Sequence, residues 1–337
     1  MVGFSAGRIW VYCVRWMWIG VAVGCFIGCA APTEQIRFAS DGARPTETDI
    51  DQDPWRLLPR GAVAFFRTDS SIWEADFGDD LAKALIEHLP LPSAVAVSPQ
   101  SDIQLVVGAA YATVNNDVAF VCQGRFDREA LNGALTSSSK NALGEEIVSI
   151  VFAGETMHVA GAFAMAVLSS KTMVFGTQLG VRRVLEVVEE GRLARELPAW
   201  FETLLKTPDA AVQVGIDLDA QAVPTVFRTR LEFLNHLRAA RLLGNYKGGG
   251  INLAGALTFD TPQAAETAAT EVNSAEEQLD RYRFLVQSLG LPQLFRRVAA
   301  QATGKDVQFA VEVESDAVSY LIEKGSEVSA LFMEQEQ

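Results

Sequence analysis

Two stretches of the chain share one order of residues: an apolar strand-like run, then Phe-Asp, then an Ala-rich segment. They occupy residues 118–135 and 251–268. In each, the aspartate stands where its carboxylate can accept hydrogen bonds from the first N–H groups of a following helix. The sequence therefore predicts two similar halves, residues 54–206 and 207–337. Strand–Asp–helix junctions are common, so chance similarity remains an alternative.

The first half alternates between strand-like and helix-like patterns. We predict strands over residues 62–67, 103–107, 117–123, 147–152, 157–160, 164–168 and 172–175, and helices over 77–89, 128–135, 181–188 and 200–205. The four short strands after residue 147 are typical of a meander. The predicted fold class is α+β, with a mostly antiparallel sheet in each half and helices packed on one face. Whether the halves share one continuous sheet is left open.

The second half carries the same mixture. We predict strands over residues 211–217, 251–257 and 307–313, and helices over 224–243, 262–289, 292–302 and 317–322. The first of these helices would carry four arginines, Arg228, Arg230, Arg238 and Arg241, in an otherwise acidic chain. This basic face is a candidate ligand or partner site. The alternative is a salt-bridged surface.

The first 28 residues have the pattern of an export signal. Arg8 and Arg15 precede an apolar run over residues 16–28, and no acidic residue is present. An apolar core of about 7–15 residues suits a signal peptide and is shorter than the roughly 20 residues of a spanning helix. Extending the run upstream would place Arg15 in lipid, at a cost of a few kcal/mol. An uncleaved membrane helix remains the alternative.

The end of this run, Phe26-Ile27-Gly28-Cys29, resembles the lipobox of bacterial lipoproteins. Gly28 supplies the small residue at the cleavage point, while Phe26 departs from the usual leucine. Residues 22–25, which end in Cys25, form a weaker second candidate. The resemblance implies cleavage before Cys29 and fatty acylation of its thiol and new amine. It also implies anchoring on the periplasmic side of an envelope membrane, and Ala30 after the cysteine favours the outer membrane.

Residues 29–53 are predicted to be the acylated cysteine followed by a flexible acidic tether, because they are polar and lack periodicity. Asp49, Asp51 and Asp53 alternate as calcium ligands do in an EF-hand loop. Pro54 stands where that loop needs glycine, and Arg60 where it needs the bidentate glutamate. We therefore expect no calcium site here.

The charge of the chain bounds its partners. The formal net charge is −14, and removal of residues 1–28, with two arginines and no acid, makes it −16. Nucleic acids are bound through basic surfaces that displace counterions, so a nucleic-acid partner is not expected. A strong negative charge also disfavours electrostatic docking to anionic lipid.

The residues that usually carry chemistry are sparse. After removal of the signal and acylation of Cys29, Cys122 is the remaining thiol, and its apolar surroundings predict a buried, inert side chain. His88, His158 and His236 lie in different predicted elements, and no metal-binding or nucleophile motif surrounds them. The sequence predicts no catalytic residue, cofactor or metal.

The resulting hypothesis is a membrane-anchored extracytoplasmic lipoprotein that binds a partner or organises the envelope without being an enzyme. Two alternatives remain open. A carrier or sensor of an apolar ligand such as lipid would have an enclosed apolar cavity, and a hydrolase would have a histidine or clustered acids in a cleft. The positions of His158, Cys122 and the arginines relative to any pocket discriminate among these hypotheses. The oligomeric state is not predicted.

Overall fold

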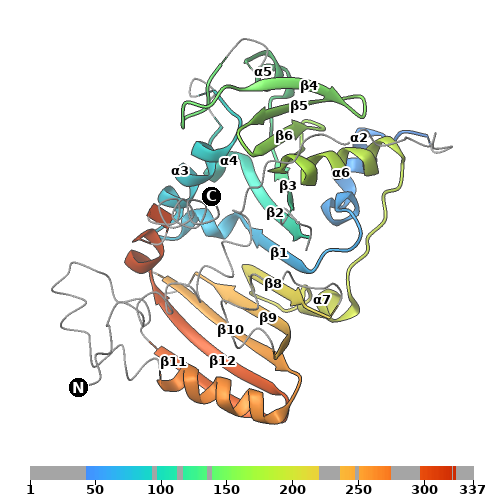
Figure 1. Ribbon diagram of the computed structural model, residues 1–337. Helices are drawn as coiled ribbons and strands as arrows, with labels where there is room; N and C mark the ends of the chain where they lie inside the picture. The colour runs from blue at the N-terminus through green and yellow to red at the C-terminus, as the bar shows by residue number, and fades with distance from the viewer. Residues whose placement is uncertain are drawn as a thin grey trace, which may run out of the picture.

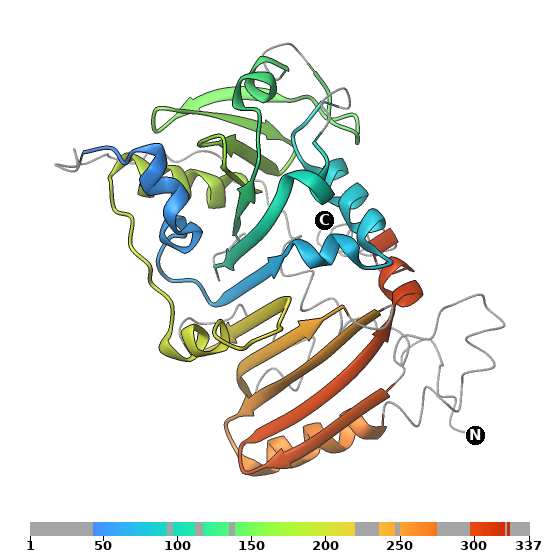
Figure 2. The same ribbon diagram turned by 180° about the vertical axis from the view of Figure 1, so that it is seen from behind.

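The computed structural model describes residues 43–92, 97–111, 117–134, 139–219, 236–246, 250–274, 297–320 and 322–323. Figures 1 and 2 show it from opposite sides. The elements up to residue 204 are α2 (Glu47–Gln52), η2 (Pro54–Leu57), β1 (Ala64–Asp69), η3 (Ser70–Glu74), α3 (Gly78–His88), α4 (Pro99–Asp102), β2 (Ile103–Ala110), β3 (Val118–Gly124), α5 (Arg128–Ala134), β4 (Val148–Phe152), β5 (Glu155–Ala160), β6 (Phe163–Val167), β7 (Thr172–Thr177), α6 (Gln178–Glu189) and α7 (Ala199–Leu204). They are followed by β8 (Val212–Asp217), β9 (Leu237–Asn245), β10 (Gly250–Phe259), β11 (Arg297–Thr303) and β12 (Asp306–Glu314), with further helical residues at 262–274 and 315–320.

One antiparallel sheet of twelve strands runs through both halves, which confirms the α+β class. Its order is β11-β12-β10-β9-β8-β1-β2-β3-β7-β6-β5-β4. The halves meet where β1 pairs with β8, and Phe66 lies opposite Val214 at that seam. The two halves therefore share one continuous sheet.

The strand order repeats about this seam. In the first half β1, β2 and β3 step outward, α5 follows, and the hairpin β6–β7 returns with β7 beside β3. In the second half β8, β9 and β10 step outward, the helix at 262–274 follows, and the hairpin β11–β12 returns with β12 beside β10. A helix follows each hairpin. The two halves thus share one order of strands and helices on either side of the seam, and β4–β5 are an extra hairpin beyond β6.

Helices cover both faces of the first half rather than the single face predicted. Neighbouring residues of one strand enter different clusters: Val106 and Cys122 pack with Phe77 beside α3, whereas Val107 and Val121 pack beneath α6. Successive side chains of a strand point to opposite faces, so these clusters lie on opposite sides of the sheet. We call the two sides the α3 face and the α6 face.

The second half keeps its core on the α3 face. Ala265 and Ala268 of the helix at 262–274 pack on Phe259 and Val307. The helix at 315–320 follows β12 as α6 follows β7, yet its Ala317 packs in the cluster of Phe77 on the α3 face. Of the helices that the structure describes, none covers the α6 face of β10, β12 and β11. Residues on that side, such as Ala254 and Ala310, are exposed.

Two helix predictions in the second half were wrong. Residues 237–243, expected to end a helix, belong to β9, which pairs with both β8 and β10. Residues 297–302, expected to be helical, belong to β11, which forms a hairpin with β12. The first segment consists of Leu, Ala and Arg, and the second is rich in Ala with one Arg and one Gln, all of which favour helices in isolation. Pairing with neighbouring strands overrides that weak preference.

The packed part of the chain begins earlier than the predicted end of the tether. Helix α2 has a capping box in which the Thr46 hydroxyl and the Asp49 carboxylate bond reciprocally to backbone N–H groups. Ile50 of this helix is buried. The acids at 49, 51 and 53, which alternate in the sequence, make separate contacts: Asp49 caps α2, Asp51 accepts from the Thr172 hydroxyl, and Asp53 pairs with Arg195. A tether upstream of residue 43 lies outside the described residues.

Candidate binding groove

A row of polar residues crosses four strands of the second half on the α6 face. Arg297 lies opposite Glu312, Glu312 opposite Asn252, and Asn252 opposite Asn245. The two asparagines are joined by a hydrogen bond of 3.1 Å from the Asn252 amide to Asn245 Oδ1. Side chains directly opposite one another in a ladder share a face, so the strand register itself builds this polar row.

A row of small apolar residues lies beside the polar row, two residues further along each strand. It consists of Ala299, Ala310, Ala254 and Leu243, which are again in register. The three alanines are exposed to solvent. Because each alanine has only a methyl group, the surface of the sheet is lower here than at the polar row, whose longer side chains extend further from the backbone. We call the resulting channel the alanine groove.

The assignment of the groove to the α6 face follows from the register across the seam. Phe65 packs against Phe201 of α7 on the α6 face, and it lies opposite Gly215. Gly215 lies opposite Arg241, and Arg241 opposite Ala256, which is two residues from Ala254 on β10. The groove therefore opens on the side that α6 and α7 cover in the first half.

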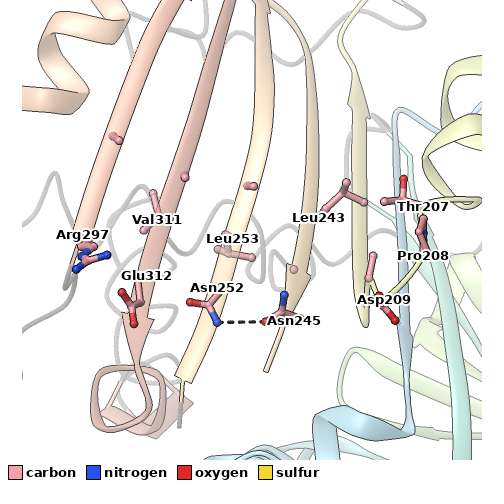
Figure 3. Close-up of a pocket in the computed structure, with 15 residues that line it drawn as sticks. Thr207, Pro208, Asp209, Leu243, Asn245, Asn252, Leu253, Arg297, Val311 and Glu312 are labelled. Atoms are coloured by element: carbon pink, nitrogen blue, oxygen red, sulfur yellow. Dashed lines mark hydrogen bonds between the residues drawn. The ribbon is translucent and has the colours of Figure 1, made fainter. Parts of the chain in front are cut away.

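The alanine groove is a measurable pocket with a volume of about 450 Å³. The turn at residues 207–210 forms one wall beside β9, and Arg297 and Glu312 stand at the opposite end (Figure 3). Asp209 in this turn has φ 59°, in the left-handed region that Asp enters more readily than most residues. Carboxylate, amide and guanidinium groups thus surround an apolar floor.

These groups suit a ligand with one apolar side and several hydrogen-bonding groups. The asparagine amides both donate and accept, the Arg297 guanidinium donates, and the Glu312 carboxylate accepts. Contact with a flat alanine floor gives apolar burial without a deep pocket. A polypeptide segment has this combination along its whole length.

The structure describes two of the four arginines of the predicted basic face. Arg228 and Arg230 lie outside the described residues. Arg238 and Arg241 both lie on β9, and each contacts a different set of residues. Arg238 donates to Asp219 at 3.2 Å and lies 3.6 Å from Asp260, whereas the Arg241 guanidinium lies 5.4 Å from the centre of the Trp200 ring.

The histidines lie apart from the groove. His88 Nδ1 is 2.9 Å from the Ala84 carbonyl, and His236 Nδ1 is 3.1 Å from Asp260 Oδ2. The hydrogen bond from His236 is the largest cause that lowers the pKa of the Asp260 carboxyl. His158 lies on β5 in the first half and is fully buried.

His158 takes part in a short polar chain. Its Nδ1 lies 2.8 Å from Ser149 Oγ, and its Nε2 lies 3.3 Å from Asn132 Oδ1. Burial lowers the pKa of the imidazole from 6.5 to about 4, so it is neutral at pH 7. The amide oxygen only accepts, so Nε2 carries the proton and Nδ1 accepts from the serine hydroxyl. The ring of His158 is inaccessible to substrate. Both of its nitrogens have hydrogen-bond partners, so the arrangement meets the hydrogen-bonding needs of a buried histidine.

Cys122 is buried, as predicted, and burial raises the pKa of its thiol. Neither Cys122, His158, Arg238 nor Arg241 lines the alanine groove. Within the described ranges, no group of three His, Cys, Asp or Glu side chains is placed to hold a metal ion. No helix in that part of the chain combines the length and apolarity required to cross a membrane.

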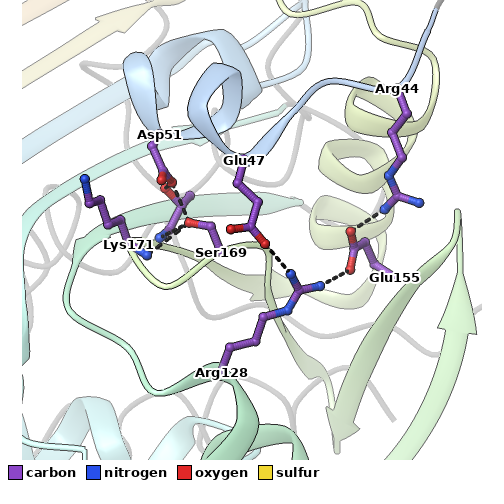
Figure 4. Close-up of polar contacts among 8 residues, drawn as sticks. Arg44, Glu47, Asp51, Arg128, Glu155, Ser169 and Lys171 are labelled. Atoms are coloured by element: carbon purple, nitrogen blue, oxygen red, sulfur yellow. Dashed lines mark hydrogen bonds and ion pairs between the residues drawn. The ribbon is translucent and has the colours of Figure 1, made fainter.

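A second polar cluster holds the N-terminal segment on the first half (Figure 4). Glu155 is ion-paired with both Arg44 and Arg128, and Arg128 also contacts Glu47 at 2.8 Å. Asp51 accepts a hydrogen bond of 2.7 Å from the Thr172 hydroxyl. These contacts join α2 and the residue Arg44 before it to α5, β5 and β7, which are distant in sequence. We call residues 44–53, which they tie down, the N-terminal strap.

Sequence reasoning missed both the groove and the strap. The alternating strand at 306–314 carries a signal for the groove, because its Asp306, Gln308, Glu312 and Glu314 mark one solvated face. The alanines form the floor of a groove only when four strands are paired in register. The strap contacts in that polar cluster join residues 81 to 121 positions apart, which no local pattern reveals.

Comparisons with known proteins give no family. No protein-family model matches the chain, and no curated protein matches it. Among solved structures, crystal form III of TP0453 has a TM-score of 0.49 and 12% identity, covering 80% of this chain and 97% of that chain. Crystal form I of TP0453 has a TM-score of 0.47 and 13% identity, covering 80% and 96%. Likeness at this level says nothing about activity.

Proposed function

We propose that this chain is a lipid-anchored extracytoplasmic protein that binds a protein partner in the alanine groove of its second half. The anchor is Cys29, acylated after cleavage of the signal, on the periplasmic side of an envelope membrane. The observation that carries the binding role is the α6 face of the second half, which no helix among the described residues covers. An apolar floor flanked by polar side chains is exposed there, whereas α6 covers the corresponding face of the first half.

The N-terminal strap supports an anchoring role for the segment before it. It fixes the chain at residue 44 through Glu155 and Arg128, so a tether from the anchor would comprise residues 30–43 and not extend to residue 53. A flexible coil of that length spans about 20 Å root-mean-square. The domain would then be held close to the headgroups, at a distance suited to partners in or on the same membrane.

The position of the described chain start also bears on access to the groove. Figure 1 places α2 beside α6 and the first half, whereas β11 and β12 lie at the other end of the molecule. If the anchor is connected to the domain through the strap, the groove lies at the end of the domain remote from that connection. A partner can approach the second half without displacing the strap.

The two alternative functions are less well supported. The groove is a channel on an open sheet face with charged and amide groups at its border, which differs from the enclosed apolar cavity that a lipid carrier requires. A hydrolase that uses a histidine is not favoured, because the His158 ring is buried and none of the three histidines lines the groove. Partner binding uses the groups that the groove presents.

Site-specific photocrosslinking in intact envelopes tests the proposal. A benzophenone side chain at position 308, two residues from Ala310 on the same face of β12, places the probe beside the groove without filling its floor. The same probe at Val151 provides a control that is 79% exposed in the first half. The proposal predicts a discrete protein adduct from position 308 and none of that mass from position 151. Introducing Ala254→Trp, which fills the adjacent floor, should abolish the adduct. Equal labelling from both positions, or an adduct insensitive to Ala254→Trp, would contradict partner binding in the groove.

A further inference from the structure

The outer edge of β11 is met by a side chain that imitates a neighbouring strand. The Asn273 amide donates to the Ala300 carbonyl at 2.8 Å, and the Ala300 N–H donates to Asn273 Oδ1 at 2.9 Å. Asn273 comes from the helix at 262–274, which lies along the hairpin β11–β12 (Figure 2). A carboxamide has the donor and acceptor of a peptide group, so Asn273 occupies the place of one residue of a missing strand.

The hairpin geometry fixes which groups of β11 face outward. Thr303 and Asp306 flank the two-residue turn and pair directly. In such hairpins the flanking residues exchange hydrogen bonds, and the pattern alternates along the ladder. Thr303, Gln301 and Ala299 therefore bond to β12, while Ala302, Ala300 and Val298 direct their N–H and C=O groups away from the sheet. The contact of Ala300 with Asn273 agrees with this assignment.

Proteins usually protect such an edge with charged side chains, proline or a bulge. Residues 298–303 of β11 are Val-Ala-Ala-Gln-Ala-Thr and contain neither charge nor proline. The β11–β12 register is continuous, without a bulge. Within the described residues, Asn273 engages the central residue of an edge that carries none of these other protections.

Basic residues stand at both ends of this edge. Arg297 begins β11 and Lys305 lies in the turn after it, and both are exposed. The neighbouring strand β12 carries acidic residues near both ends of β11, since Glu312 lies opposite Arg297 and Asp306 lies opposite Thr303. A strand added on the outer side would be favoured by acids in the same two places.

We propose that the β11 edge binds an extended peptide segment of a partner protein with acidic residues at both ends, which adds as a further antiparallel strand. Asn273 acts as a built-in competitor that occupies Ala300 until the segment displaces it. The site uses backbone groups at the edge of the sheet, whereas the alanine groove uses side chains on its face, so neither proposal depends on the other.

The test uses a capped, fluorescent peptide with the β12 sequence, Asp-Val-Gln-Phe-Ala-Val-Glu-Val-Glu, and the chain from residue 30 onward. Fluorescence anisotropy measures its binding. Asn273→Ala should tighten binding at least about tenfold, because two hydrogen bonds no longer need to be broken. Thr270→Ala, one turn earlier on the same helix, should leave the affinity unchanged, since that hydroxyl bonds within its own helix.

Two further measurements locate the peptide on the edge. Adding Ala302→Pro to Asn273→Ala removes an outward N–H without removing a bond to β12, and it should reverse the gain. If this double variant no longer melts cooperatively, binding to Asn273→Ala is measured instead with two peptides, N-methylated at either the odd or the even positions. The peptide whose methyl groups replace the N–H groups that face β11 should not bind. An affinity insensitive to Asn273→Ala, or to both of these changes, would overturn the proposal. So would concentration-dependent dimerisation of Asn273→Ala without peptide binding, which would identify a second copy as the occupant.

Discussion

Phe65 of β1 lies directly opposite Gly215 of β8, at the seam where the two halves become one sheet. Phe65 stacks on Phe201 with ring centroids 5.2 Å apart, and Trp200 lies edge-on to Phe201 at 5.6 Å. Gly215 permits this arrangement because a Cβ at this position would lie 2.5 Å from Trp200 and 2.6 Å from Phe201. The aromatic residues of α7 therefore pack across the seam onto both halves.

Substitution of Gly215 tests this packing. Gly215→Val would force Trp200 and Phe201 away from the sheet, and overpacking of this kind costs about 1–3 kcal/mol. Urea denaturation should show that loss in the free energy of unfolding. Gly133→Ala, at a position with no atom within 4 Å of the added Cβ, serves as the control and should not destabilise the chain. Equal stability of the two variants would show that α7 does not pack tightly over the seam.

His158 should make the fold sensitive to acid. Its folded-state pKa of about 4 is below the unfolded value of 6.5, so the unfolded chain binds the proton more readily. The stabilisation is complete above pH 6.5 and is lost as the pH falls towards 4, by at most about 3 kcal/mol. Chemical denaturation at pH 7 and pH 4.5 measures the loss.

A pair of variants assigns this acid sensitivity. His158→Gln should reduce the difference between the two pH values, because glutamine does not titrate. His88→Gln, where the imidazole contacts a helix carbonyl, should retain the full difference. If both variants keep the wild-type pH dependence, another group is responsible and the account of His158 is wrong.

The N-terminal strap should loosen when its central acid is neutralised. Glu155, whose side chain is 10% exposed, serves both Arg44 and Arg128, and Glu155→Gln removes the charge from both contacts. We expect a loss of about 1–3 kcal/mol in local stability, seen as faster hydrogen exchange over residues 44–53 while exchange in β2 and β3 is unchanged. Glu47→Gln is the matched control: this side chain is 59% exposed, and such pairs contribute about 0–1 kcal/mol. Exchange that rises equally in both variants would contradict a central role for Glu155.

The elements of the first half were largely predictable from sequence because local pattern and tertiary context agree there. The meander from Val148 to Thr177 alternates clearly and is divided by turns such as Ala153-Gly154, where both residues have positive φ. The helix with Val181, Val184 and Val188 on one side matches α6. In these segments the residues that favour an element also face the core.

The second half was less predictable because local preference and context disagree. Leu237–Asn245 contains helix-favouring residues, yet it is held as a strand from both sides. The groove could not be inferred before the register placed Ala254 beside Ala310. Asp51 was interpreted as part of a solvated tether, since its contacts with Ser169 and Thr172 lie beyond the reach of a sequence window.

The proposed anchor at Cys29 determines where the whole domain would be placed. Metabolic labelling with radioactive palmitate, followed by the intact mass of the mature chain, measures it directly in cells that export the full-length protein. We predict label on the wild type and on Cys25→Ala, with a mature N-terminus at residue 29, and loss of label and of membrane association in Cys29→Ala. Retention of label in Cys29→Ala, or an unlabelled wild-type chain that keeps residues 1–28, would contradict the proposed lipid anchor.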